Sequence, residues 1–191
     1  MKLHPQYARI LLSVQGILKH GVTPWSGIVY RYASGKYSSD KKIISGIGAY
    51  RAGGRWNSPN SFHAVYCASS PELAHSEFLS AYRLAGIPLS KALPVTGKAF
   101  EVNGAAALDL RDARILSLLS LSLQQLKEDR WKEATDEGRD SLCQAVGRAA
   151  FTSGIEILLV PSILEPDDGN FNVVLIIENA QTPSEKFKVI P

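Results

Sequence analysis

Apolar positions recur along this chain with two periods, and the two periods predict a mixture of helices and strands. A spacing of three and four residues predicts helices over residues 5–20, 71–85, 111–127 and 140–152. Short apolar runs between turn residues predict strands over residues 27–32, 64–68, 98–102, 155–160 and 172–177. We therefore expect one α+β domain over residues 25–191, preceded by a helical segment over residues 1–24.

The interval between residues 33 and 54 has neither period. Its glycines, serines and lysines predict a long loop, and loops of this length commonly carry function or move. A second turn is expected at residues 166–169, where Pro-Asp-Asp-Gly separates two apolar strands.

Composition narrows the class of protein. With 191 residues and 45% hydrophobic content, the chain is expected to bury a full core. The net charge of +3 comes without a long block of lysine or arginine, so we expect an anionic small molecule as ligand and no direct nucleic-acid binding. Cys67 and Cys143 lie among apolar residues, which indicates buried thiols in a reducing cytoplasm. No apolar run is long enough for a membrane span.

Glu77 is the residue that departs most clearly from the hydrophobic pattern. Ser70 and Pro71 open its helix as N-cap and first helical residue, and Glu77 then falls in the apolar stripe, one turn from Leu73 and from Ala81. A carboxylate that faces a core costs several kcal/mol unless it is paired or protonated. We interpret Glu77 as a site residue, and a buried ion pair with an arginine is the structural alternative.

Arg31 is the first candidate cation. It lies between Tyr30 and Tyr32 in a predicted strand, so its side chain must face away from both tyrosines. If it faces inward it needs an anion, whereas an arginine at the rim would pair weakly with a surface carboxylate.

Arg55 is the second candidate cation. It follows Gly53 and Gly54, which allow a close backbone approach to a ligand, and its guanidinium fork suits phosphate oxygens. A turn with a solvated arginine and a structural Trp56 is equally compatible with the sequence.

Three polar residues near strand ends are further candidates. Tyr66 can stack on a planar ring or pack in the core. Ser162, after Pro161 at the end of a buried strand, can donate to a phosphate or ribose oxygen or cap a turn. Asn172 opens the last predicted strand and can bond to a ribose or phosphate group or hold a loop together.

Other common chemistries lack their motifs. His63, Cys67 and His75 are close in sequence but do not have a zinc-site spacing, so we expect no metal. The sequence contains no G-x-S-x-G elbow, no P-loop and no G-x-G-x-x-G fingerprint, which argues against a serine hydrolase and the common nucleotide-binding folds.

Taken together in chain order, these motifs resemble the RES domain. The resemblance rests on Tyr30-Arg31, Gly53-Gly54-Arg55-Trp56-Asn57, Val65-Tyr66, the helix with Glu77, and Val160-Pro161-Ser162 ahead of Asn172. The family is named for an arginine, a glutamate and a serine, which correspond here to Arg55, Glu77 and Ser162, while Arg31 matches a second arginine. The long interval between the two arginines and the N-terminal helix depart from the family pattern.

This resemblance implies a toxin of a bacterial type II toxin–antitoxin system with a mixed β core similar to that of ADP-ribosyltransferases. Members of such families use NAD as a substrate: they degrade it by hydrolysis or phosphorolysis, or they transfer its ADP-ribose to a protein. The implied partner is an antitoxin with an Xre-like helix-turn-helix, which covers or enters the site and forms a hetero-oligomer with the toxin.

The residue types suit cleavage of the bond between nicotinamide and ribose. This reaction passes through an oxocarbenium-like centre that the Glu77 carboxylate would stabilise, while Arg31 and Arg55 would hold the pyrophosphate. The residues that would contact the rest of NAD are Tyr66, by stacking on nicotinamide, and Tyr32, Ser162 and Asn172. The alternatives are ADP-ribosylation of a protein and, in a different class, a non-catalytic module that binds a protein through residues 33–54.

Overall fold

A closed set of strands forms the centre of the molecule. The computed structural model describes residues 1–20, 23–164 and 169–190. Its strands are Thr23–Ser34 (β1), Ala64–Ala68 (β2), Val95–Asp109 (β3), Ile157–Pro161 (β4), Phe171–Ile176 (β5) and Phe187–Ile190 (β6). They are ordered β1-β2-β5-β4-β3-β6, and an additional β1–β3 pairing closes the first five into a ring. Because β3 and β4 are parallel and the other pairs are antiparallel, the sheet is mixed.

The amount of strand pairing differs around the ring, and it is smallest between β1 and β2; we call this boundary the seam. β1 pairs with β3 from Thr23 to Ser34, whereas it pairs with β2 only at Tyr30, opposite Ala68. β2 gives the rest of its pairing to β5. The two strands therefore diverge, and side chains of β1 can reach the exposed main chain of β2 across this seam.

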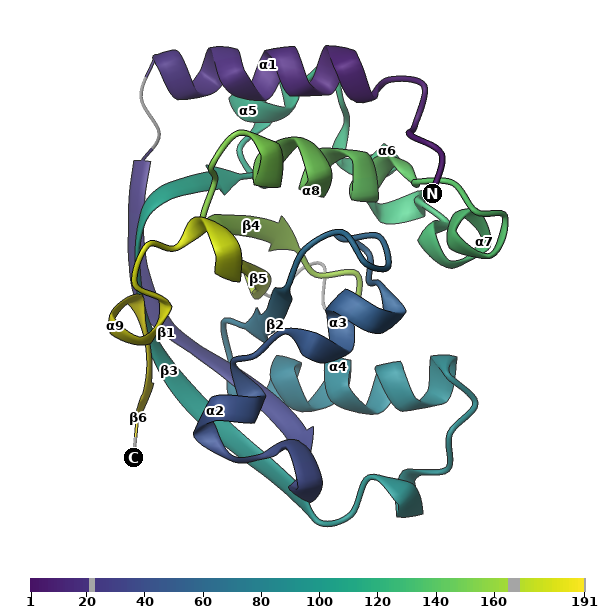
Figure 1. The fold of residues 1–191 in the computed structure, drawn as a ribbon, viewed down its shortest axis with the longest axis vertical. Coiled ribbons are helices and arrows are strands. Elements are labelled where there is room, and N and C mark those ends of the chain that lie inside the picture. The colour runs from purple at the N-terminus through teal and green to yellow at the C-terminus, as the bar shows by residue number, and fades with distance from the viewer. Residues whose placement is uncertain (21–22, 165–168, 191) are drawn as a thin grey trace.

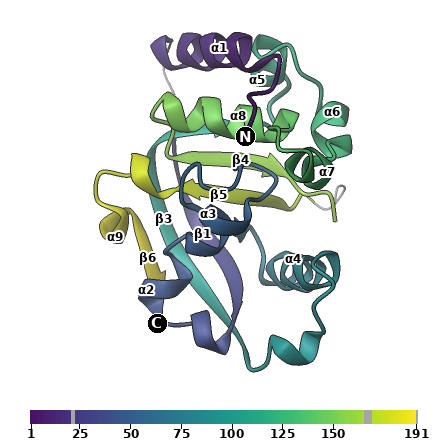
Figure 2. The same ribbon diagram turned by 45° about the vertical axis from the view of Figure 1, so that its right-hand side comes forward.

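Helices cover the ring on several sides (Figure 1). The α-helices are Tyr7–Lys19 (α1), Asp40–Ile43 (α2), Ile47–Ala52 (α3), Pro71–Leu84 (α4), Ala113–Leu118 (α5), Leu123–Glu128 (α6), Trp131–Asp136 (α7), Leu142–Thr152 (α8) and Pro183–Lys186 (α9). Both ribbon views place α8 between α1 and strand β4 (Figures 1 and 2). In Figure 1, α4 lies on the opposite side of β2 from α8.

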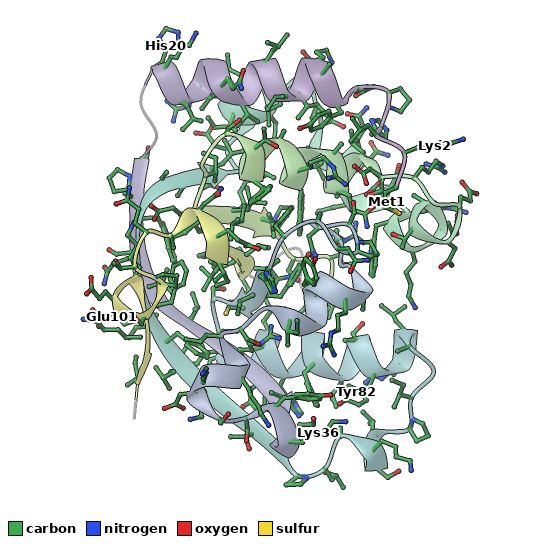
Figure 3. The ribbon with its side chains drawn as sticks, in the orientation of Figure 1. Met1, Lys2, His20, Lys36, Tyr82 and Glu101 are labelled. Atoms are coloured by element: carbon green, nitrogen blue, oxygen red, sulfur yellow. The ribbon has the colours of Figure 1, made fainter. Side chains whose placement is uncertain are left out.

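Two apolar cores occupy the two faces of the strands. One lies between the sheet and α1, α5 and α8, and it includes Ile10, Val14, Val146 and Leu158. The other lies inside the ring, and it includes Val29, Phe100 and Val173. Side chains fill the space between the helices and the strands throughout (Figure 3). Strand alternation thus assigns each functional side chain to one of two distinct environments.

Polar residues begin the main helices as their sequences indicate. The Ser70 hydroxyl accepts from the Leu73 amide at 3.1 Å, and Pro71 follows as first helical residue, which confirms the predicted start of α4. Ser122 and Ser141 form capping boxes at α6 and α8. These caps fix where the helices meet the strand ends.

The apolar stripe of α4 is buried only in its first half. Leu73 and Ala74 are buried, whereas Ala81 and Ala85 are exposed and Leu84 is 60% exposed. The C-terminal half of the stripe therefore lies outside the core.

Several other predicted boundaries are also wrong. Residues 33–54 contain the end of β1, a 3₁₀ turn at Gly35–Tyr37, α2 and α3, so the segment is not a structureless loop. The predicted helix over residues 111–127 is two helices, because Ser120 adopts a left-handed φ of 52° between them. The short α7, α9 and β6 have too few residues to show a period. The predicted turn at 166–169 lies, except for Gly169, outside the described residues.

The N-terminus lies beside α7. The Lys2 amide donates to the Gly138 carbonyl at 2.8 Å, and the Lys2 carbonyl accepts from the Asp140 amide at 2.8 Å, so Met1 and Lys2 are held against this part of the molecule (Figure 3). The predicted N-terminal helix is confirmed as α1, which packs on α8 through Ile10 and Val14. No helix in the described part of the chain is long and apolar enough to span a membrane.

Candidate active site

The proposed site begins where β2, β4 and β5 lie next to one another. In register, Ala68 of β2 and Val160 of β4 flank Asn172 of β5 on its two sides. Because α4 starts directly after β2, it carries Glu77 back over these strands. The Asn172 side-chain amide donates to a Glu77 carboxylate oxygen at 2.6 Å. Two residues that are 95 positions apart are thus in direct contact.

Asn172 has a second polar atom that the fold does not use. Its Oδ1 is buried and has no hydrogen-bond donor among the residues that the structure describes. An unsatisfied buried acceptor costs about 1–3 kcal/mol, so natural proteins rarely retain one without a reason. A ligand hydroxyl or amide beside Glu77 would satisfy this atom.

Glu77 itself is half-buried, at the edge of the apolar environment that its periodicity predicts. The structural alternative paired its carboxylate with Arg31 or Arg55. Instead, both arginines donate to main-chain carbonyl groups elsewhere. A neutral group, the amide of Asn172, contacts the Glu77 carboxylate.

Arg31 spans the seam between β1 and β2. Strand alternation places it on the inner face with Val29 and Ala33, while Tyr30 and Tyr32 pack on the α4 side, as the sequence predicts. Its Nη1 donates to the Tyr66 carbonyl at 2.5 Å, and its buried Nε has no partner in the described part of the chain. Burial lowers the pKa of the Arg31 guanidinium. The fold therefore keeps a cation in an apolar place without satisfying it fully.

Arg55 has a different environment. Its Nη1 donates to the carbonyl groups of Leu126 at 3.0 Å and Asp129 at 3.2 Å, at the C-terminal end of α6. The Gln144 side chain donates to the Gly54 carbonyl at 3.1 Å, and a Cβ on Gly147 would lie 1.7 Å from the Trp56 carbonyl oxygen. These contacts hold the Gly53–Asn57 turn tightly against α6 and α8.

Tyr66 supports the same turn from the sheet. Its hydroxyl accepts from the Trp56 amide at 2.9 Å and donates to Asn57 Oδ1 at 2.8 Å. A Cβ on Gly54 would lie 2.5 Å from this hydroxyl, which explains the glycine at that position. Burial raises the pKa of Tyr66, so the phenol stays neutral. Its hydroxyl is used by the fold, and the ring alone is left for stacking.

The remaining sequence-predicted residues lie around this centre. The Tyr32 ring is 5.1 Å from the His75 ring of α4 and packs where Gly97 leaves room for it. Ser162 is buried, and its hydroxyl accepts from the Leu164 amide at 3.1 Å. The structure thus brings Glu77 and Asn172 into contact. It also places Tyr66 between Arg31 and the Gly53–Asn57 turn. It places Arg31 and Glu77 on opposite faces of the sheet.

Ser162 also lines a hollow of about 420 Å³ at the ends of β3 and β4. Its other lining residues are Asp109, Arg111, Asp112, Leu123, Lys127, Pro161, Gly169 and Asn170. The sequence reasoning missed Arg111 and Lys127, because the residues around them follow the pattern of a helix surface. In the described part of the chain, no cluster of three or more His, Cys, Asp and Glu side chains could hold a metal ion.

Comparisons with known proteins identify the family of this chain. A family model described as the RES domain matches residues 28–188. Proteins named NAD(+) phosphorylase MbcT from Mycobacterium tuberculosis and Mycobacterium bovis are 32% identical over 151 residues, 78% of this chain and 74% of theirs. The crystal structure of the M. tuberculosis MbcT–MbcA toxin–antitoxin complex superposes with a TM-score of 0.71 at 27% identity, over 95% of this chain and 89% of that chain. This chain belongs to the RES domain family.

Proposed function

We propose that this protein is a toxin that cleaves the bond between nicotinamide and ribose in NAD and thereby depletes cellular NAD. The observation that carries the proposal is the Glu77 carboxylate, held at 2.6 Å by the Asn172 amide next to a buried acceptor without a donor. The names of the MbcT relatives, which are NAD(+) phosphorylases, support the same substrate.

In this mechanism Glu77 stabilises positive charge at the ribose carbon. As the bond to nicotinamide breaks, the ring nitrogen takes the electron pair and the sugar becomes oxocarbenium-like. A carboxylate fixed in advance lowers the energy of that state without rearrangement during the reaction. The Asn172 amide fixes it, and its Oδ1 would accept from a ribose hydroxyl or from the carboxamide of nicotinamide.

The other predicted residues have graded roles in the proposal. In the proposal the pyrophosphate enters the seam between β1 and β2 from the Glu77 face and meets Arg31, a buried cation whose Nε has no partner among the described residues. Tyr32 and Tyr66 provide aromatic rings on the α4 side. Arg55 acts by holding the Gly53–Asn57 turn over Tyr66, which makes it a positioning residue in our account rather than a ligand of NAD.

The catalytic unit in this proposal is residues 25–191, with the segment 1–24 as a cover over α8. We further propose that an antitoxin neutralises the toxin by covering the site, as the complex of MbcT with MbcA suggests. An Xre-like helix-turn-helix antitoxin and a cytoplasmic location are parts of the same proposal. The two buried thiols are in keeping with a reducing compartment.

The test is to incubate the purified protein with NAD and to quantify free nicotinamide and the ADP-ribose product. We expect the wild type to release nicotinamide. Glu72→Gln should also release it, and this variant is the matched control for Glu77→Gln because Glu72 is exposed on the same helix. Intact NAD after prolonged incubation with the wild type would contradict the proposal and favour a binding module. Transfer of labelled ADP-ribose to protein would identify the reaction as ADP-ribosylation.

A further inference from the structure

The C-terminal half of α4 and the segment that follows it form an exposed apolar surface. Leu84 is 60% exposed, and Ile87, Leu89 and Leu93 are 45%, 42% and 68% exposed. We call residues 81–94, which contain these four side chains, the 81–94 surface. Single exposed leucines are ordinary, but a cluster of them marks a place where another molecule binds.

The 81–94 surface is anchored at both of its ends. Where the chain leaves α4, the Ile87 amide donates to the Tyr82 carbonyl at 3.0 Å. Where it joins β3, the Pro94 carbonyl accepts from the Gly35 amide at 2.6 Å. Both ribbon views show this part of the chain between α4 and the lower end of the molecule (Figures 1 and 2). The apolar side chains are therefore presented by a backbone with defined contacts.

The helical part of this surface is the outer half of an apolar stripe. Leu84 follows Leu73 by eleven residues and Glu77 by seven, so it lies on the same side of α4, with Ala81 between. Leu73 is buried, whereas Ala81 and Leu84 are exposed. An apolar stripe at helical spacing packs against another element in a folded protein. Because the ridges of one helix fit the grooves of another, a helix from another molecule would suit this stripe.

The charges on the 81–94 surface are of one sign. Residues 78–100 contain no aspartate or glutamate. Arg83 and Lys91 are exposed, and neither forms an ion pair with a residue that the structure describes. Lys132 of α7 adds a further cation, because its Nζ donates to the Leu84 carbonyl at 2.5 Å. Complementarity of charge therefore calls for carboxylates on the molecule that binds here.

A second copy of this chain does not meet that requirement. A two-fold symmetric contact brings the same surface together twice, so the cations of the 81–94 surface would face cations. Carboxylates on two other elements, Asp40 of α2 and Glu133 of α7, are paired with Lys98 and Arg130. These carboxylates are used within the chain, so the binding partner has to bring its own.

We propose that the 81–94 surface binds an amphipathic helix of a different protein, with its apolar stripe against Leu84 and Ile87 and its carboxylates beside Arg83 and Lys91. In this mode of recognition, apolar side chains at helical spacing provide affinity and the flanking charges provide orientation. Leu84 lies about 10 Å beyond Glu77 along α4, so the surface is outside the proposed catalytic site. The inference therefore does not depend on the cleavage of NAD.

The probe is a fluorescent synthetic helix of about 18 residues with a leucine stripe and glutamates elsewhere, and its counterpart has lysines in place of the glutamates. Fluorescence anisotropy measures the binding of both to the wild type, Leu84→Glu, Arg83→Glu and the control Leu12→Glu, whose leucine is 69% exposed on α1. We expect the wild type to bind the glutamate helix at least about tenfold more tightly than the lysine helix. Leu84→Glu and Arg83→Glu should each weaken that binding about tenfold, and Leu12→Glu should match the wild type.

All three substitutions are at exposed positions, so each variant should keep the urea midpoint of the wild type, and a loss of binding then reports on the surface. Equal affinity for the two helices, or unchanged binding by Leu84→Glu, would overturn the proposal. A wild-type dimer that Leu84→Glu dissociates, seen by light scattering, would assign the surface to a second copy instead. Sedimentation with vesicles of phosphatidylglycerol and phosphatidylcholine, without binding of the glutamate helix, would assign it to lipid. Failure to cleave NAD would leave these binding results unchanged and would contradict the proposed function alone.

Discussion

Two arginines of this protein are both candidate cations by sequence, but they have opposite structural situations. Arg55 follows a pair of glycines and donates to the carbonyl groups of Leu126 and Asp129, so it secures the end of α6. Arg31 lies in the seam between β1 and β2, with one bond to Tyr66 and a buried Nε that has no partner. The hydrogen bonds of Arg55 stabilise the fold, whereas the Nε of Arg31 can still donate a hydrogen bond to a ligand.

The same contrast separates Tyr66 from Asn172. The Tyr66 hydroxyl has both a donor and an acceptor inside the protein. The Asn172 amide nitrogen donates to Glu77, and its buried Oδ1 has no hydrogen-bond donor among the described residues. Since unsatisfied buried atoms cost stability, they mark places where a ligand is expected. By this criterion we propose that Arg31 and Asn172 belong to the site, together with Glu77, which Asn172 contacts, and that Arg55 and Tyr66 support it.

Replacing Arg31 should have the largest effect on NAD binding without lowering the stability of the protein. Arg31→Met removes a buried cation that is only partly satisfied, so the free energy of unfolding should stay the same or rise. The KM for NAD should rise about 10- to 100-fold, the effect of losing a charged hydrogen bond. Steady-state kinetics and urea denaturation measure the two effects. A less stable variant with normal kinetics would make Arg31 a structural residue.

Asn172→Asp should have the next largest effect and a distinctive pH dependence. It places a second carboxylate against Glu77, and two like charges in contact hinder each other's ionisation. We expect the acid limb of the pH–rate profile to move to higher pH, and the rate at pH 7 to fall about tenfold. Asn172→Ala provides the control, because it removes the amide without adding charge. The same pH profile in all three proteins would rule out a positioning role.

Arg55→Ala should mainly affect stability. It removes two bonds from a cation to buried carbonyl groups, which together contribute about 2 kcal/mol to the free energy of unfolding. The folded fraction should cleave NAD at about the wild-type rate, since the Gly53–Asn57 turn keeps its bonds to Tyr66 and Gln144. Chemical denaturation with activity measured per folded molecule tests this. A variant that is as stable as the wild type but inactive would show that Arg55 takes part in NAD binding or catalysis.

The smallest change is expected at the cysteines. Burial raises the pKa of Cys67 to about 12 and holds the pKa of Cys143 well above its usual value. The reactive thiolate is therefore scarce at pH 8, and a thiol reagent should modify neither residue in the native protein. Both should react after denaturation. Rapid modification of one thiol in the native protein would contradict this packing.

Much of the fold follows from local signals. The Ser70–Pro71 start of α4, α1 and the apolar β4 and β5 were predictable, because each contains its own cap, period or apolar run. The split between α5 and α6 was not, since it depends on a left-handed Ser120. Residues 33–54 include the short helices α2 and α3. Helices of this length contain too few residues for a hydrophobic period to be detected in the sequence.

The site could be predicted in part. Glu77 stood out because a carboxylate interrupts an apolar stripe, yet its partner Asn172 is 95 residues away and only the pairing of β2 with β5 brings it there. Spacing could not distinguish Arg31 from Arg55, because the difference lies in which carbonyl groups each one reaches. Arg111 and Lys127 were missed because a surface pattern hides cations that line a hollow.

The most direct test of the account is the rate of nicotinamide release from NAD bound to Glu77→Gln, at saturating NAD. Glutamine keeps the size of the side chain and can still contact Asn172, but it lacks the negative charge. We predict that the variant binds NAD with an affinity within about threefold of the wild type and releases nicotinamide about 1,000-fold more slowly, a loss typical of removing electrostatic stabilisation of a transition state. Release at a rate near that of the wild type would contradict the central role of the Glu77 carboxylate.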